Sequence, residues 1–166
     1  VQRKNPLAVI RAFRQAFAEE RRDVFLMIKS SNGHRNPAAM RQLLNEIGGD
    51  RRIVLKDDII EGRHLHALQR CCDAYVSLHR AEGLGLGMAE SMRLGKPVIA
   101  TGWSGNMEFM SQENSLLVNS RLFEVGAGEY PSAEGLRWAD PEIGRLDQVE
   151  AALPGILQPS SRGLAL

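Results

Sequence analysis

Short apolar segments alternate with amphipathic segments over residues 6–118, and this alternation most constrains the fold. Strand and helix are expected to alternate about five times, with strands at residues 24–28, 53–55, 74–78, 97–100 and 115–118. The first of these lacks the apolar–polar alternation of a strand with one face in water, and all are short and apolar, so we expect a parallel sheet covered on both faces. The class is α/β, a doubly wound parallel sheet, in which ligands bind beyond the carboxyl ends of the strands.

The helical segments carry their own start and stop signals. Asn5-Pro6 and Asn36-Pro37 each place an N-cap residue before a proline, and Gly48-Gly49 ends the second helix. Further helices are expected at residues 63–72, 86–94 and, as a short one, 104–110. Residues 119–141 lack a clear period and are expected to form a long irregular connection, and residues 142–153 are a candidate last helix.

Composition excludes several classes of protein. The 166 residues carry 21 Lys and Arg against 20 Asp and Glu, a net charge of +1 that argues against a strongly basic nucleic-acid binder. No apolar run approaches the roughly 20 residues that span a bilayer. Cys71 and Cys72 are adjacent, which argues against a disulfide framework, and no residues show metal-ligand spacing. We therefore expect a reduced, cytoplasmic compartment and no metal.

The most informative segment follows the expected strand at 74–78. Residues 79–90, His-Arg-Ala-Glu-Gly-Leu-Gly-Leu-Gly-Met-Ala-Glu, form a glycine-rich turn into a helix. Glycines allow close backbone approach to a phosphate, and a helix N-terminus offers unpaired N–H groups. Met88 replaces the third glycine of a dinucleotide fingerprint, and no Gly-Lys-Ser/Thr follows as in an ATPase phosphate loop. Glycines alone also fit a tight turn without a ligand.

Two carboxylates flank this turn. Seven residues separate Glu82, in the loop, from Glu90, about one turn into the helix. Glu90 lies among apolar neighbours and so needs a specific partner, for which a ribose diol is suited because one carboxylate can accept two hydroxyl hydrogen bonds. The alternative is that Glu82 is a solvated loop residue and Glu90 interacts only with the helix dipole, which is worth ~0.3–1 kcal/mol.

The run EGLGLGMAESMRLGKPVIAT, from Glu82 to Thr101, resembles the donor-binding signature of retaining GT-B glycosyltransferases of family 4. Its hallmark is Glu, seven residues, Glu, a small-residue helix, Gly-x-Pro-Val and a strand. Residues 73–78, the Ser104-Gly105-Asn106 turn with Glu108, and the Arg3-Lys4-Asn5-Pro6 turn are similar to further parts of the family pattern. The resemblance covers roughly residues 3–143.

The resemblance implies a role for each matching residue. Glu82 would lie by the donor sugar, and Lys4 would neutralise the diphosphate of the leaving group without a metal. The implied donor-binding residues are Glu90 for the ribose, Gly83, Leu84 and Gly85 for the sugar hydroxyls or diphosphate, Asp57 to Ile59 for the base, and Gly105 and Asn106 for the pocket floor. The donor is a nucleotide-diphosphate sugar, and no separate cofactor is implied.

The resemblance also implies an organisation. Residues 1–144 would be the Rossmann-like carboxyl-terminal half of a GT-B fold, and residues 145–166 a poorly matched tail, a helix and then disorder. The family's Arg before the Lys, and its amino-terminal acceptor domain, lie outside the chain. We therefore expect weak donor binding and little turnover from this chain alone. Transfer to a glycan or lipid-linked acceptor, as in polysaccharide biosynthesis, would need the missing domain.

Other functions stay open at this stage. The chain could be a stand-alone, non-catalytic nucleotide- or sugar-binding module, or a gene remnant that keeps the fold. A GT-B epimerase or phosphorylase is less favoured, because those enzymes lack this pairing of motifs or carry a cofactor lysine that we do not find. Peripheral association of a full enzyme with a membrane and the oligomeric state are also open.

Several side chains have two readings each. Lys4 could be an ordinary surface residue, and His79 either contacts the donor sugar or is a hydrogen-bonded structural histidine. Arg80 pairs with a phosphate or a surface carboxylate, and Trp103 stacks on a ligand or packs. His64 and His66 are two apart on a helix, hence on different faces, and are not a metal pair.

Overall fold

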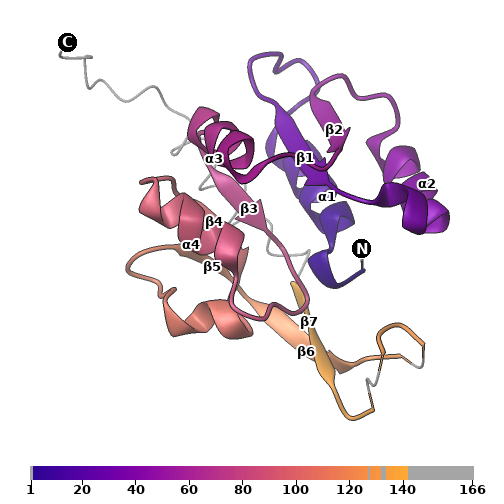
Figure 1. Ribbon diagram of the computed structural model, residues 1–166, viewed down its shortest axis with the longest axis vertical. Coiled ribbons are helices and arrows are strands. Elements are labelled where there is room, and N and C mark those ends of the chain that lie inside the picture. The colour runs from indigo at the N-terminus through magenta and orange to yellow at the C-terminus, as the bar shows by residue number, and fades with distance from the viewer. Residues whose placement is uncertain (1, 127, 132–133, 142–166) are drawn as a thin grey trace.

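The computed structural model describes residues 2–126, 128–131 and 134–141 (Figure 1). The helices are α1 (Pro6–Ala16), α2 (Pro37–Ile47), α3 (Gly62–Cys71) and α4 (Leu86–Arg93), with 3₁₀ turns η1 (Gln2–Lys4), η2 (Gly33–Arg35) and η3 (Gly105–Glu108). The strands are β1 (Leu26–Ser30), β2 (Ile53–Asp57), β3 (Tyr75–Ser77), β4 (Val98–Thr101), β5 (Leu116–Val118), β6 (Ser120–Glu124) and β7 (Arg137–Pro141). The alternation predicted up to residue 118 is confirmed, with shifts of one or two residues at most ends.

The first five strands are parallel, as predicted. β1 pairs with β2 in the register Leu26 to Ile53, and β4 lies between β3 and β5. Within the described residues these strands form two separate parallel sheets, β1-β2 and β3-β4-β5, and not one continuous sheet. Among the described strands, β1 therefore hydrogen-bonds only to β2, and β3 only to β4.

One hydrophobic core nevertheless joins the two sheets. Ile10, Phe13 and Phe17, in and just after α1, belong to the same buried cluster as Leu78, just after β3, and Ile99 of β4. A second cluster, under α4, contains Val98 and Ala100. Because neighbouring residues of β4 enter different clusters, both faces of its sheet are covered, as a doubly wound fold requires.

The two predicted asparagine caps differ. The Asn36 side chain accepts a hydrogen bond from the amide of Ala39 at 3.1 Å, which confirms that N-cap. Asn5 forms no side-chain cap, so that part of the prediction is wrong. Its backbone is left-handed (φ 49°) and its amide closes η1 by donating to the carbonyl of Gln2, which leaves the side chain out of capping position.

The irregular connection predicted at residues 119–141 is wrong. β6 and β7 form an antiparallel hairpin that projects from the rest of the molecule (Figure 1). Phe123 lies opposite Trp138 with ring centroids 6.3 Å apart, and the guanidinium of Arg80 lies over both rings. The strands are too short for their alternation to stand out, and long-range aromatic packing stabilises them. The candidate helix at 142–153 and the tail at 145–166 lie outside the described residues.

Candidate functional site

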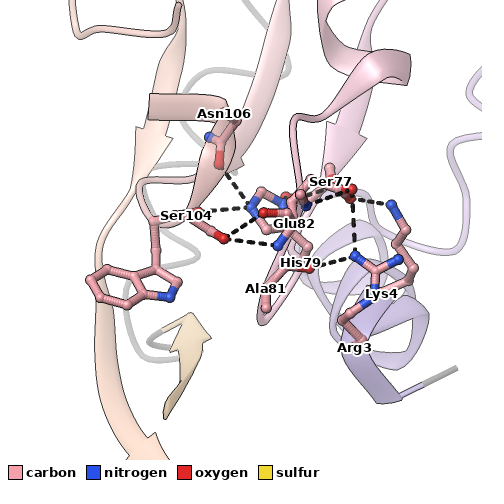
Figure 2. A network of polar contacts seen from close by, with 10 residues as sticks. Arg3, Lys4, Ser77, His79, Ala81, Glu82, Ser104 and Asn106 are labelled. Carbon is pink, nitrogen blue, oxygen red and sulfur yellow. Dashed lines mark hydrogen bonds and ion pairs between the residues drawn. The ribbon is translucent and has the colours of Figure 1, made fainter. Parts of the chain in front are cut away.

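The candidate site begins with the loop that leaves the carboxyl end of β3. The Glu82 carboxylate, 11% exposed, forms ion pairs with the ammonium of Lys4 and with Nη1 of Arg3, the latter at 3.4 Å (Figure 2). Arg3 also donates to the carbonyl of Ala81 at 2.9 Å. The structure thus brings together Lys4 and Glu82, which are 78 positions apart in the sequence.

These contacts fix the charge of Glu82. Burial raises the pKa of its carboxyl, but the hydrogen bond from Lys4, the charges of Lys4 and Arg3, and the Gly83 amide outweigh burial, so the pKa is lowered. Glu82 is therefore ionised at neutral pH. Lys4 is 54% exposed, so its ammonium can leave Glu82 for an anion in solution without crossing buried protein.

A tight turn at Ser104-Gly105 holds the backbone of Glu82. The Ser104 hydroxyl donates to the Glu82 carbonyl at 2.6 Å and accepts from the Glu82 amide at 3.0 Å, and the Gly105 amide donates to the same carbonyl. Ser104 has φ 86° and ψ −159°, a conformation that costs a non-glycine residue roughly 1–3 kcal/mol. A Cβ added to Gly105 would lie 1.7 Å from the carbonyl oxygen of Gly83. Turn and loop are therefore fitted to each other.

His79 and Asn106 brace this arrangement from inside, and both are 0% exposed. His79 Nε2 lies 3.1 Å from the Trp103 carbonyl and 3.1 Å from Asn106 Oδ1 (Figure 2). The amide nitrogen of Asn106 donates to the Thr101 carbonyl at 3.1 Å. The other ring nitrogen, Nδ1, lies 3.0 Å from the Ser77 hydroxyl and 3.1 Å from the Ser77 carbonyl. His79 is thus a structural histidine, and the Asn106 side chain is buried against it and does not reach the protein surface.

The glycine-rich turn leads into α4 as predicted. Gly85 (φ 89°) is buried directly before the first turn of α4, and a Cβ there would lie 2.6 Å from the Met88 side chain. Gly83 and Leu84 are exposed, the latter by 52%. The turn therefore presents an accessible backbone at a helix N-terminus, the arrangement that binds phosphates in other proteins.

Glu90 lies on α4 beside α3 and is 37% exposed. Gln69 Nε2 lies 3.3 Å from one of its carboxylate oxygens, and His66 Nε2 lies 3.7 Å from the other. Burial raises the pKa of Tyr75, and the negative charges of Glu82 and Glu90 raise it further. A Cβ on Gly87 would lie 2.6 Å from the Tyr75 hydroxyl, so Tyr75 sits under the first turn of α4.

The expected base-binding residues lie at the end of β2. The Gly33 amide donates to both carboxylate oxygens of Asp57, at 3.0 and 3.2 Å, which ties together the loops after β1 and β2. Ile59 is 81% exposed. The described contacts do not connect Asp57 or Ile59 to Glu82 or to the glycine-rich turn.

The sequence analysis named Arg3 and Ser104 only as members of matching turns, without roles of their own, and assigned no part in the site to Gln69, His66 or Tyr75. Arg3 and Ser104 could have been predicted, since each is adjacent in sequence to a predicted site residue. Gln69, His66 and Tyr75 are brought to the site by the packing of helices, which no local sequence signal indicates. Arg80 packs on the hairpin aromatic rings, and its charged partner is Asp140 at 3.9 Å.

Two features are absent from the described part of the chain. It holds no group of three or more His, Cys, Asp or Glu residues placed to bind a metal ion. Within the same residues, every helix is too short or too polar to cross a membrane.

Comparisons with known proteins agree with this architecture. The family model of the "Glycosyl transferases group 1" matches residues 1–128. The chain resembles the solved "GtfA/B complex" with a TM-score of 0.64 and 18% identity over 96% of this chain and 28% of that one. It also resembles the pneumococcal O-GlcNAc transferase GtfA, solved with UDP and GlcNAc, with a TM-score of 0.58 and 18% identity over 92% of this chain and 26% of that one.

At these identities the structural likeness shows the fold, and this chain spans little more than a quarter of either solved relative. No curated protein matches significantly. The family match covers most of the chain, and the parallel α/β fold with its GT-B relatives agrees with it. The chain belongs to the group 1 glycosyl transferases.

Proposed function

We propose that the chain is the donor-binding domain of a retaining glycosyltransferase and binds a nucleotide-diphosphate sugar. The observation that carries the proposal is the pairing of Lys4 with Glu82 beside an accessible glycine-rich turn at the N-terminus of α4. Fold and family membership support a glycosyltransferase domain, and this local geometry supports the donor role.

The diphosphate would lie against the turn at Gly83–Gly85. Backbone N–H groups there and at the start of α4 can donate to phosphate oxygens, each charge-assisted bond being worth about 1.5–3 kcal/mol. Lys4 would transfer from Glu82 to the phosphates, which stabilises the leaving group without a metal. Glu82, freed from Lys4, would then accept hydrogen bonds from the donor sugar.

The nucleoside would lie between α4 and the carboxyl ends of β1 and β2. Glu90 is suited to accept hydrogen bonds from a ribose diol, because only Gln69 and His66 contact its partly exposed carboxylate among the interactions described above. The base would then lie toward Asp57–Ile59, where the exposed Ile59 offers an apolar surface. In this pose Gly105 and Asn106 form the floor through their backbone and their packing.

Turnover would require the rest of a longer protein. The chain covers 28% and 26% of the two solved relatives, and none of the described residues is assigned to the acceptor. We propose a glycan or lipid-linked acceptor held by an amino-terminal domain, with this chain inactive alone. Cys71 and Cys72 are both free thiols, in keeping with the proposed cytoplasmic location.

Calorimetric titration with UDP, GDP and ADP tests the proposal. We expect saturable binding of one nucleotide, and about a tenfold loss of affinity in Glu90→Gln, which removes the charge but keeps the shape. Glu113→Gln, an exposed glutamate outside the site, is the matched control and should bind like the parent chain. Equal affinity in Glu90→Gln, or no binding of any nucleotide by the folded chain, would contradict a donor site built from these residues.

A further inference from the structure

A polar side chain occupies the most protected position of α3. Of the ten residues of this helix, all described, Gln69 alone is buried, with 7% of its surface exposed. It lies four positions after the partly buried Leu65 and next to the partly buried Leu68, on the face that α3 turns toward the protein (Figure 1). An apolar residue would fit this face, so the glutamine needs a reason of its own.

Two acceptors on α4 fix the orientation of the Gln69 amide. Its nitrogen Nε2 lies 3.3 Å from Oε2 of Glu90 and 3.5 Å from the carbonyl oxygen of Gly87. A carboxylate and a peptide carbonyl only accept hydrogen bonds, so the NH₂ group of Gln69, and not its carbonyl oxygen, must face α4. Gln69 therefore donates to Glu90 from the buried side of that carboxylate.

This orientation leaves the carbonyl oxygen of Gln69 unpaired. Oε1 is buried and has no hydrogen-bond partner among the residues that the structure describes. A buried acceptor without a partner destabilises a fold, and native proteins contain few of them without a functional reason. Methionine could fill the same space without leaving an acceptor unpaired. The glutamine is therefore better explained by its contact with Glu90 than by the stability of α3.

The second oxygen of the Glu90 carboxylate stays available to a ligand. His66 Nε2 lies 3.7 Å from this oxygen, Oε1, which is beyond hydrogen-bond distance, and the interactions of Glu90 described above include no other contact with it. The Glu90 side chain is 37% exposed. One carboxylate oxygen is thus held by a buried partner, while the group as a whole remains accessible from solution.

We propose that Gln69 is a positioning residue that fixes the rotation of the Glu90 carboxylate, so that this carboxylate selects nucleotides with an intact ribose diol. A carboxylate has about four acceptor sites, and the hydrogen bond from Gln69 occupies one of them, which leaves enough for two hydroxyls. A carboxylate that is already oriented loses less conformational freedom when the ribose binds. The inference rests on the proposed function, because it takes the nucleotide of the donor as the ligand of Glu90.

Paired NMR titrations with UDP, GDP and ADP and with their 2′,3′-dideoxy counterparts test the proposal. The ratio of the two dissociation constants isolates the ribose hydroxyls, because base and phosphates are the same in each pair. The parent chain should prefer one ribonucleotide over its dideoxy form by about tenfold or more. In Gln69→Met, which keeps the length of the side chain but removes the donor, this ratio should fall about fivefold, with the affinity for the dideoxy form unchanged.

Two further variants separate positioning from a structural role. Leu68→Met, the matched control on the adjacent residue of α3, should leave the ratio as in the parent chain. Adding Gln69→Met to Glu90→Gln should lower the ratio no further than Glu90→Gln alone, since both changes act through one carboxylate. The Tm of Gln69→Met should equal or exceed that of the parent chain, because the unpaired acceptor is gone.

The outcomes distinguish this inference from the function on which it rests. An unchanged ratio in Gln69→Met, or an additive loss in the double variant, would overturn the positioning role and leave donor binding intact. Failure of the parent chain to bind any of the three ribonucleotides, or equal binding of the ribose and dideoxy forms, would contradict the proposed function and the inference with it.

Discussion

Replacing Gly105 by alanine tests whether the Ser104-Gly105 turn and the Glu82-Gly83 loop fit each other as described. The new Cβ would lie 1.7 Å from the Gly83 carbonyl oxygen and 2.5 Å from its carbon, both backbone atoms that cannot rotate away. The loop must therefore separate from the turn. That separation breaks the Gly105 amide bond and the two Ser104 hydroxyl bonds to the backbone of Glu82.

The magnitude follows from these bonds. Each intramolecular hydrogen bond contributes about 1 kcal/mol net, so Gly105→Ala should lower the free energy of unfolding by about 2–3 kcal/mol. For a chain of this size that corresponds to a fall in Tm of roughly 5–10 °C. The assay is thermal unfolding by circular dichroism, with urea unfolding to check that the m-value is unchanged.

Gly83→Ala is the matched control in the same loop. A Cβ at Gly83 would meet nothing within 4 Å, so this variant should unfold within about 0.5 kcal/mol of the parent chain. If Gly105→Ala also unfolds within about 1 °C of the parent, the described contact between turn and loop is wrong.

Three further predictions concern the framework. A hydrogen bond from buried Arg52 lowers the pKa of Asp50 to about 2, so this pair stabilises the fold above pH 4, and the stabilisation is lost as pH falls toward 2. Asp50→Asn should lower the free energy of unfolding, measured with urea, by about 2 kcal/mol at pH 7 and flatten its pH dependence. An unchanged loss of stability at acid pH in this variant would contradict the assignment. Asn36→Ala should lower the free energy of unfolding by about 1 kcal/mol because it removes an N-cap hydrogen bond. Asn5→Gly should leave the free energy of unfolding unchanged, because Asn5 has a left-handed backbone and its side chain forms no cap. Equal losses of stability in thermal melts of the two variants would argue against this distinction. Trp138→Ala should destabilise the protein by about 3 kcal/mol and abolish the near-UV signal of the hairpin aromatic rings, and a native-like spectrum would show that those rings do not pack.

Local signals were enough to predict the alternating fold. The Asn36-Pro37 start and the Gly48 stop of α2 depend on residues within one turn of each end, so they can be read from the sequence. The division into two separate sheets could not be predicted, because the local sequence of a strand does not determine which other strands it pairs with. The hairpin was missed for a similar reason, since Phe123 and Trp138 stabilise it across a long connection.

The site shows the same division. The glycine-rich turn and its two glutamates stand in one run of sequence, and the family resemblance added the distant Lys4 to them. The sequence predicts the same role for the neighbouring residues Gly105 and Asn106, but their positions differ. The Gly105 backbone contacts the Glu82 loop, whereas the Asn106 side chain is directed inward to His79. The contact of Gln69 with Glu90 arises where α3 meets α4, and no local pattern indicates it.

The central claim is that donor nucleotides bind at the glycine-rich turn, and an NMR titration of the ¹⁵N-labelled chain with UDP, GDP and ADP tests it most directly. We predict saturable shifts at the amides of Gly83, Leu84 and Gly85 and in α4 around Glu90, with no comparable shifts in β6 and β7. Shifts confined to other parts of the fold, or none with any of the three nucleotides, would contradict a donor site at the carboxyl end of β3.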